Sequence, residues 1–149
     1  MPLGIRSRLG HSVDMRTILA DDNKEIRSAL RLLLEELGET DIAEAADLGE
    51  ALRTLRQARP SPEPGPAVVL LDWELPAGGF RTGGCAAFVA EARRSAPGCR
   101  LIAMSGRPES RANALRAGCD AFVCRTDPPD RLLALLAPGG PAEDHQPGS

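Results

Sequence analysis

The sequence predicts an α/β fold in which helices cover both faces of a doubly wound, five-stranded parallel sheet. Two observations support this prediction. Five short apolar segments alternate along the chain with five helix-like amphipathic segments, as in repeated strand–helix units. The central segment, 68–71, is a run of four branched apolar residues, which suits a strand covered on both faces. The simplest arrangement of such a sheet has the strand order 2-1-3-4-5.

Length and composition limit the possible classes of protein. The 149 residues suffice for one domain, which we place at 17–137, between a disordered leader at 1–16 and a disordered tail at 138–149. A net charge of −3 argues against a general nucleic-acid-binding surface. No apolar run approaches the roughly 20 residues of a membrane span, and the leader lacks the apolar core of a signal peptide. We therefore expect a cytoplasmic protein without direct nucleic-acid or membrane partners.

Helix caps define the first two strand–helix units. A short apolar strand at 17–20 precedes a helix that begins after Asn23 and stops at Gly38. A second strand at 41–45 precedes a helix that begins at Asp47, with Glu three residues later as in a capping box. The apolar face of the first helix is expected to consist of Ile26, Leu30, Leu33, Leu34 and Leu37.

The second half of the chain repeats the pattern after a proline-rich connection. Residues 60–66 can form neither a helix nor a central strand, and the glycine-rich segment 77–84 is expected to be a mobile loop. Asp127 is expected to cap the last helix. The other elements are expected at 85–95 (helix), 101–104 (strand), 108–117 (helix), 121–124 (strand) and 127–136 (helix).

Polar residues follow four of the five predicted strands. Asp21 and Asp22 follow the first strand, Asp72 the third, Ser105 the fourth and Arg125 the fifth. Each residue alone has an ordinary explanation as a solvated strand end or a helix cap. In the order 2-1-3-4-5, however, the first and third strands are neighbours, and their carboxyl ends share one crevice. The joint placement therefore predicts a functional site.

The chemistry of this set favours phosphoryl transfer. Three clustered carboxylates repel one another unless a cation neutralises them. Hard oxygen ligands without nearby thiol or imidazole groups favour Mg²⁺, with Mn²⁺ as a second possibility. Such an ion would align a phosphoryl donor with Asp72 as the nucleophile. The hydroxyl of Ser105 and the charge of Arg125 could then hold the phosphoryl oxygens.

Four segments resemble the receiver domain of two-component response regulators, a flavodoxin-like, CheY-like fold. They are Ile18–Asn23, Val69–Pro76, Met104–Gly106 and Gly118–Arg125, within a match over about 17–136. The resemblance implies that Asp72 accepts a phosphoryl group from a sensor histidine kinase. It also implies which residues bind Mg²⁺ and which residues form the switch. Asp22 would bind the ion directly, Asp21 largely through water and Glu74 through its backbone carbonyl, and Asp72 would also be a ligand. Ser105 would couple the phosphoryl group to Phe122 as the switch aromatic.

The resemblance further implies the partners. A sensor histidine kinase or phosphotransfer protein would supply the phosphoryl group. A downstream protein target, or a second copy in a homodimer, would bind the face made by 108–117, 121–124 and 127–136. The chain would not be an enzyme beyond phosphorylating and dephosphorylating itself. Because the sequence ends soon after the last helix, we expect a stand-alone receiver.

Three features depart from the family pattern or modify it. Arg125 stands where the family has lysine, and its planar guanidinium needs different room. The loop at 77–84 is about two or three residues longer than usual and richer in glycine. Glu74 and Arg107 lie two positions beyond Asp72 and Ser105, where residues commonly flank the phosphoryl group. Our hypothesis is that this opposite-charge pair obstructs attacking water and prolongs the phosphorylated state.

Two other functions remain open. The arginine and the altered loop are compatible with a receiver-like scaffold that binds partners without phosphorylation. A haloacid-dehalogenase-type phosphohydrolase also uses a nucleophilic Asp after an apolar strand, followed by a Ser or Thr. In that class, however, a second acid follows the nucleophile by two residues, and only Glu74 loosely matches it. The acidic pair of that class also comes later in the chain, whereas Asp21 and Asp22 precede Asp72.

Overall fold

In the computed structural model, residues 16–57, 67–80 and 83–136 are described. The predicted tail and the proline-rich connection lie outside these residues, as does the predicted leader except for its last residue. That residue, Arg16, is the first residue of a strand, so the first strand begins one position earlier than expected.

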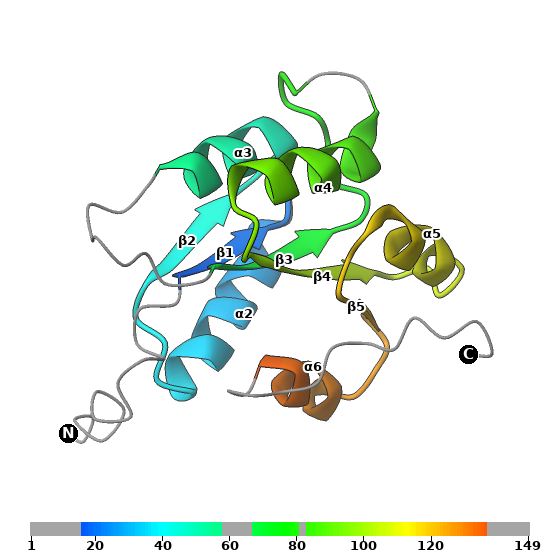
Figure 1. The fold of residues 1–149 in the computed structure, drawn as a ribbon. Helices are drawn as coiled ribbons and strands as arrows, with labels where there is room; N and C mark the ends of the chain where they lie inside the picture. Colours follow the sequence, from blue (N-terminus) through cyan, green and yellow to red (C-terminus); the bar gives the residue numbers. More distant parts are fainter. Residues whose placement is uncertain (1–15, 58–66, 81–82, 137–149) are drawn as a thin grey trace.

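Every predicted strand and helix is present among the described residues (Figure 1). The first half contains β1 (Arg16–Ala20), α2 (Lys24–Glu36), β2 (Ile42–Ala45), α3 (Leu48–Arg56) and β3 (Ala67–Asp72). The second half contains α4 (Gly84–Ser95), β4 (Arg100–Ser105), α5 (Ser110–Ala117), β5 (Ala121–Cys124) and α6 (Pro129–Leu136). No described helix has both the length and the apolar character that crossing a bilayer requires.

The five strands form one parallel sheet in the order β2-β1-β3-β4-β5. The predicted strand order is therefore confirmed. Helices α3, α4 and α5 lie on one side of the sheet, and α2 and α6 lie on the other (Figure 1). This doubly wound arrangement makes β1 and β3 neighbours, so their carboxyl ends open into the same crevice.

The fully buried strand β3 supplies both layers of the core. Val69 and Leu71 pack toward α3, α4 and α5, whereas Val68 and Leu70 pack toward α2 and α6. A strand covered on both faces needs apolar residues at every position, which explains the unbroken apolar run in the sequence. Burying each of these side chains contributes about 2 kcal/mol, and the run holds Asp72 rigidly at its end.

The predicted caps of the first two helices are present. The side chain of Asn23 accepts hydrogen bonds from the backbone N–H groups of Glu25 and Ile26, at 2.8 and 3.1 Å. Helix α2 ends before Gly38, whose φ of 93° is strained for any residue with a side chain. Asp47 accepts from the N–H of Glu50 at 2.8 Å, so α3 also begins as expected.

Helix α2 differs from its predicted burial. Of its five predicted inward residues only Leu34 is buried, and Leu37, the C-cap residue, is 41% exposed. The other three, Ile26, Leu30 and Leu33, are half-buried. They line an apolar groove of about 270 Å³ together with residues of β4, β5 and α6. This face is only partly covered because the groove lies between α2 and α6.

The role predicted for Asp127 is wrong, because α6 begins two residues later, at Pro129. The carboxylate of Asp127 instead accepts the N–H of Cys124 at 2.9 Å. It also lies 3.6 Å from Nε of Arg131. Asp127 therefore closes the turn between β5 and α6, directly beside Arg125.

The first part of the glycine-rich loop is held in place rather than mobile. The carbonyls of Pro76 and Ala77 accept the N–H groups of Leu48 and Gly49 at the start of α3, at 2.9 and 3.1 Å. Gly78 has a φ of +54°, and a Cβ added there would lie 2.0 Å from Cγ of Asp47. Glycine is therefore required at this contact. Residues 81–82 lie outside the described part of the loop.

Candidate functional site

Three carboxylates meet at the carboxyl ends of β1 and β3. One oxygen from each of Asp21, Asp22 and Asp72 can be chosen so that all three lie within 4.8 Å of one another. Asp21 and Asp72 are only 1% and 4% exposed, whereas Asp22 is exposed. The structure therefore brings together the three acids that the strand order predicted. Two of them are buried, and the third opens toward solvent.

Backbone N–H groups fix the positions of both buried carboxylates. The N–H of Asn23 donates to Oδ1 of Asp21 at 2.8 Å, and the N–H of Glu74 donates to Oδ1 of Asp72 at 3.0 Å. Each donor comes two residues after its acceptor, which is the geometry of an Asx-turn. The turn at Asp72 engages Oδ1 and leaves Oδ2 for a cation or a substrate, whereas Oδ2 of Asp21 already receives the guanidinium of Arg125.

Arg125 supplies the positive charge at the end of β5. Its Nη2 contacts Oδ2 of Asp21 in a charge-assisted hydrogen bond and lies 3.6 Å from Oδ1 of Asp72. Its backbone N–H donates to the carbonyl of Ser105 at 2.8 Å, which fixes the two strand ends together. The guanidinium thus neutralises part of the negative charge of the two buried acids.

The pKa of Asp72 is raised above its usual value, chiefly because burial disfavours the charged form. The nearby Asp21 and Asp22 carboxylates raise it further. The N–H of Glu74 and the guanidinium of Arg125 oppose the rise but do not cancel it. In this arrangement an additional cation would lower the electrostatic free energy of the site.

The residues present fit a hard divalent cation. The cluster offers carboxylate oxygens only, and its exposed member, Asp22, gives access from solvent. The nearby Cys85 is not a competing ligand, because burial raises its pKa to about 11. Its thiol donates instead toward the carbonyls of Asp72 and Trp73, at 3.6 and 3.3 Å. This donor set suits Mg²⁺ or Mn²⁺ better than a softer metal.

Two supporting residues escaped the sequence analysis. Arg27 on α2 donates through Nη1 to the backbone carbonyl of Asp21 at 2.7 Å, and through Nε to Glu44 at 2.8 Å. Arg31 donates to the second oxygen of Glu44, also at 2.8 Å. These hydrogen bonds lower the pKa of Glu44 below its usual value. In the sequence Arg27 is one more charge on a polar helix face, and no local pattern links it to β1.

Ser105, Glu74 and Arg107 form a second group beside the carboxylates. The hydroxyl of Ser105 donates to Oε2 of Glu74 at 3.2 Å and accepts the backbone N–H of Arg107 at 2.9 Å. Nε of Arg107 lies 3.3 Å from the same Oε2. The opposite-charge pair of our hypothesis therefore forms, and it includes the serine as well.

Phe122, the expected switch aromatic, lies on β5 and is 3% exposed. Its side chain belongs to the core between the sheet and α3, α4 and α5. Ser105 lies on the neighbouring strand β4, in register with Cys124. Ser105 and Phe122 therefore lie on neighbouring strands, and Phe122 is in register with Ala103.

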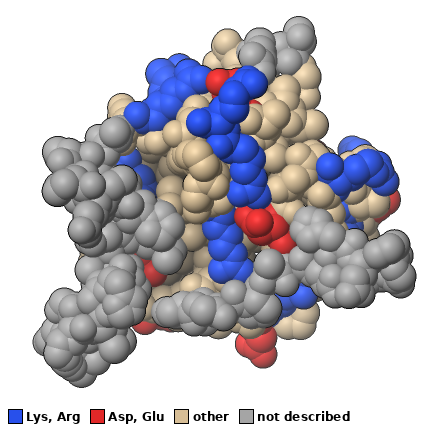
Figure 2. All heavy atoms as spheres, in the orientation of Figure 1, with Lys and Arg blue, Asp and Glu red and all other residues tan. Residues whose placement is uncertain are grey.

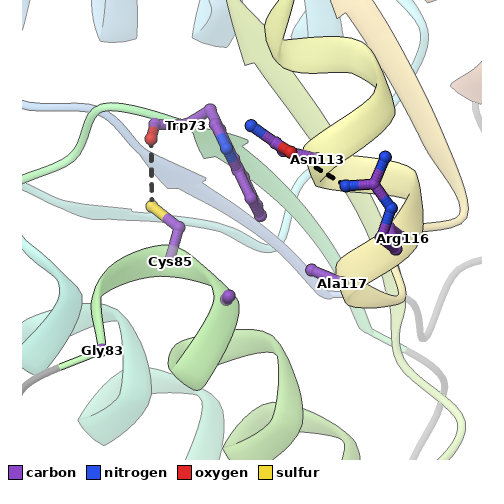
Figure 3. A pocket seen from close by; sticks show the side chains of 7 residues that line it. Trp73, Gly83, Cys85, Asn113, Arg116 and Ala117 are labelled. Atoms are coloured by element: carbon purple, nitrogen blue, oxygen red, sulfur yellow. Dashed lines mark hydrogen bonds between the residues drawn. The ribbon is translucent and has the colours of Figure 1, made fainter.

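A separate cavity of about 530 Å³ lies between the start of α4 and α5. Trp73 reaches across it toward Asn113 and Arg116 of α5, while Cys85 points to the Trp73 carbonyl (Figure 3). None of the three carboxylates is among the described residues that line this cavity. It is therefore a neighbour of the acidic site and not its opening.

A band of arginine crosses the face where α3 and α4 run (Figure 2). The last turns of the two helices carry Arg53, Arg56, Arg93 and Arg94. Both Arg56 and Arg94 pair with Glu91, at 2.7 and 2.5 Å, and Arg93 pairs with Asp120 at 3.0 Å. Arg56–Glu91 and Arg93–Asp120 join neighbouring elements and Arg94–Glu91 lies within α4, so the band is mainly a structural network and not a basic groove.

Residues 17–137 match the family model of the response regulator receiver domain. The match covers most of the chain, and the chain therefore belongs to this family. The strand order and the acidic cluster described above agree with this membership. No curated protein sequence matches the chain.

Solved structures of receiver domains have the same fold. A CheY-like receiver domain protein from Methanospirillum hungatei JF-1 is 25% identical, with a TM-score of 0.63 over 80% of this chain and 87% of its own. A LuxR-family response regulator from Aurantimonas sp. SI85-9A1 is 26% identical, with a TM-score of 0.61 over 82% of each chain. A response regulator from Burkholderia pseudomallei is 19% identical, with a TM-score of 0.65 over 85% of this chain and 68% of its own. The last was crystallised with a phosphorylated aspartic acid, a calcium ion and citrate.

Proposed function

We propose that this receiver domain accepts a phosphoryl group on Asp72 in a reaction that depends on Mg²⁺. The observation that carries the proposal is the buried Asp72 carboxylate, which two further carboxylates and the Arg125 guanidinium surround. The phosphorylated aspartic acid and calcium ion in the Burkholderia pseudomallei structure support it by analogy. A bound Mg²⁺ or Mn²⁺ would neutralise the cluster and orient the donor.

The donor that we propose is a phosphohistidine of a sensor histidine kinase or a phosphotransfer protein. An Asp72 oxygen forms the new bond to phosphorus, the phosphorus–nitrogen bond breaks, and the electron pair leaves with the imidazole, which takes up a proton. Asp21, Asp22, Asp72 and the Glu74 carbonyl would hold the ion. Arg125 and Ser105 are placed at adjacent strand ends, where they can hold phosphoryl oxygens.

The output that we propose is a protein–protein interaction that depends on phosphorylation. It would use the face of α5, β5 and α6, and either a downstream protein or a second copy of the chain would bind there. A related solved structure is described as a beryllofluoride-activated dimer of the NtrC4 receiver domain. We further propose that the protein acts in the cytoplasm, and that its only catalytic activity is its own phosphorylation and dephosphorylation.

The proposal is tested by incubating the chain with Mg²⁺ and acetyl phosphate, or with Mg²⁺ and beryllofluoride. We expect an increase in intact mass with acetyl phosphate and a change in Trp73 fluorescence with beryllofluoride. An unchanged mass together with an unchanged spectrum would favour the scaffold function. Steady hydrolysis of a generic phosphate ester would instead favour the phosphohydrolase.

A further inference from the structure

The hydroxyl of Ser105 is fully engaged in the structure. Ser105 is 0% exposed, so water does not reach its hydroxyl, whereas the Glu74 side chain that accepts from it is 43% exposed. Its oxygen accepts the N–H of Arg107 at 2.9 Å, and its hydrogen points to Oε2 of Glu74 at 3.2 Å. A serine hydroxyl has one hydrogen to donate. In this state that hydrogen belongs to the Glu74 carboxylate.

The proposed phosphoryl group needs the same hydrogen. A phosphoryl oxygen on Asp72 carries negative charge and accepts hydrogen bonds only, so Ser105 can stabilise it only by donating to it. The hydroxyl cannot donate fully to Glu74 and to the phosphoryl group at once. The two acceptors therefore compete, and each favours a different position of Ser105.

We propose that Glu74 is a positioning residue that holds the Ser105 hydroxyl in the resting state. The Ser105–Glu74 hydrogen bond must then break before the hydroxyl can donate to a phosphoryl group on Asp72. This inference rests on the proposed role of Asp72 as phosphoacceptor. It differs from the shielding hypothesis, in which the Glu74–Arg107 pair blocks water. Shielding would slow the loss of the phosphoryl group, whereas in the present proposal the Glu74 carboxylate favours the resting position of Ser105.

The position of Glu74 couples it directly to the phosphoacceptor. Its N–H donates to Oδ1 of Asp72 at 3.0 Å, and the following N–H of Leu75 donates to the carbonyl of Asp72 at 3.0 Å. Glu74 is thus part of the turn that orients the Asp72 carboxylate. A phosphoryl group on that carboxylate would therefore lie beside the turn from which the Glu74 side chain reaches Ser105.

Arg107 contributes less than Glu74 in this proposal. Its Nε lies 3.3 Å from Oε2 of Glu74, but its side chain is 69% exposed. An ion pair so open to water stabilises either state by very little. The Arg107 backbone N–H, which contacts Ser105, is present whatever the side chain. Removing the guanidinium therefore leaves the serine–carboxylate hydrogen bond in place.

The test measures beryllofluoride binding in the presence of Mg²⁺, followed by the fluorescence of Trp73, the single tryptophan of the chain. We expect Glu74→Ala to bind about fivefold more tightly than wild type, because one hydrogen bond to a charged acceptor no longer favours the resting state. Glu74→Gln keeps an acceptor at the same place and should lie between the two. Arg107→Ala should stay within about twofold of wild type.

A double-mutant cycle separates this effect from simple repulsion between Glu74 and the bound anion. In a Ser105→Ala background, the additional change Glu74→Ala should have almost no effect, because the hydrogen bond is already absent. A gain equal to that in the wild-type background would overturn the proposal and assign the effect to charge alone. Arg94→Ala, which removes another ion pair with an exposed arginine, within α4, is the matched control. Thermal unfolding verifies that each variant folds.

Failure of the proposed function gives a different result. If wild type binds beryllofluoride and Glu74→Ala binds it equally well, Asp72 remains the phosphoacceptor and only the role of Glu74 is wrong. If neither wild type nor any variant responds to beryllofluoride or acetyl phosphate, both proposals fall.

Discussion

Two groups of charged residues flank Asp72, and they differ in their exposure to water. The acidic group, Asp21 with Arg125, is almost completely buried on the carboxylate side, with Asp21 at 1% exposure. The second set, the serine group, consists of Ser105 with Glu74 and Arg107, whose charged side chains are 43% and 69% exposed. Charge interactions weaken steeply with access to water. Similar ion pairs should therefore have different effects. We expect the acidic group to determine whether the site forms, and the serine group to adjust how the site switches.

The largest difference is expected between Arg125→Ala and Arg107→Ala. Without divalent cations, Arg125→Ala leaves the buried Asp21 carboxylate without its cation and should lower the free energy of unfolding by about 2 kcal/mol. Arg107→Ala removes a solvated pair and should change it by less than about 0.5 kcal/mol. Urea unfolding in the presence of a chelator measures both. Equal losses in the two variants would contradict the contrast between the groups.

Divalent cations should reverse part of the Arg125→Ala defect. A cation at Asp21, Asp22 and Asp72 takes over the neutralising role of the guanidinium, and a ligand that binds only the folded state stabilises it. We expect Mg²⁺ to raise the melting temperature of Arg125→Ala more than that of wild type, by at least about 2 °C. Adding Asp22→Ala should abolish the rise. If Mg²⁺ shifts wild type and Arg125→Ala alike, the guanidinium does not compete with the cation.

A smaller effect is expected on the lifetime of the phosphorylated protein. If the Glu74–Arg107 pair obstructs water, the double variant Glu74→Ala with Arg107→Ala should lose its phosphoryl group about threefold faster, a barrier change of roughly 0.6 kcal/mol. Decay of the phosphorylated protein, followed by intact mass, measures the rate. An unchanged lifetime would refute shielding. It would not refute the proposed hydrogen bond from Ser105 to Glu74 in the resting state, which is tested by beryllofluoride binding.

The smallest effect is expected at the outer support of the acidic group, Glu44. Hydrogen bonds from Arg27 and Arg31 lower its pKa, so its ionised form stabilises the folded state. This contribution is fully present above the unfolded pKa of about 4.3 and is lost as the pH falls through the lower folded value. Glu44→Gln should therefore cost about 0.5 kcal/mol at pH 7, and the cost should disappear once the pH lies below the lowered folded pKa. A cost independent of pH would mean that charge plays no part.

The sequence predicted the features that depend on the order of strands. The apolar run before Asp72 suited a doubly covered strand, and parallel topology then placed Asp21 and Asp22 beside it. Asn23 and Gly38 were identifiable because helix caps depend on residues close in sequence. Ser105 and Arg125 followed from the same alternation of strands and helices.

The features that were missed depend on contacts between distant residues. Arg27 meets Glu44 across 17 residues, and Ser105 meets Glu74 across 31. Such pairs are set by side-chain rotamers after the helices have packed, and hydrophobic periodicity contains no information about them. The exposure of Leu37 likewise depends on where α2 ends against the sheet.

The central claim is that Asp72 accepts the phosphoryl group, and intact-mass measurement after phosphotransfer tests it most directly. Wild type and Asp72→Asn are incubated in parallel with Mg²⁺ and acetyl phosphate, with a chelator-treated sample of each as the control. We expect wild type to gain the mass of one phosphoryl group only when Mg²⁺ is present, and Asp72→Asn to gain none. An unmodified wild type, or an equal gain in Asp72→Asn, would contradict it.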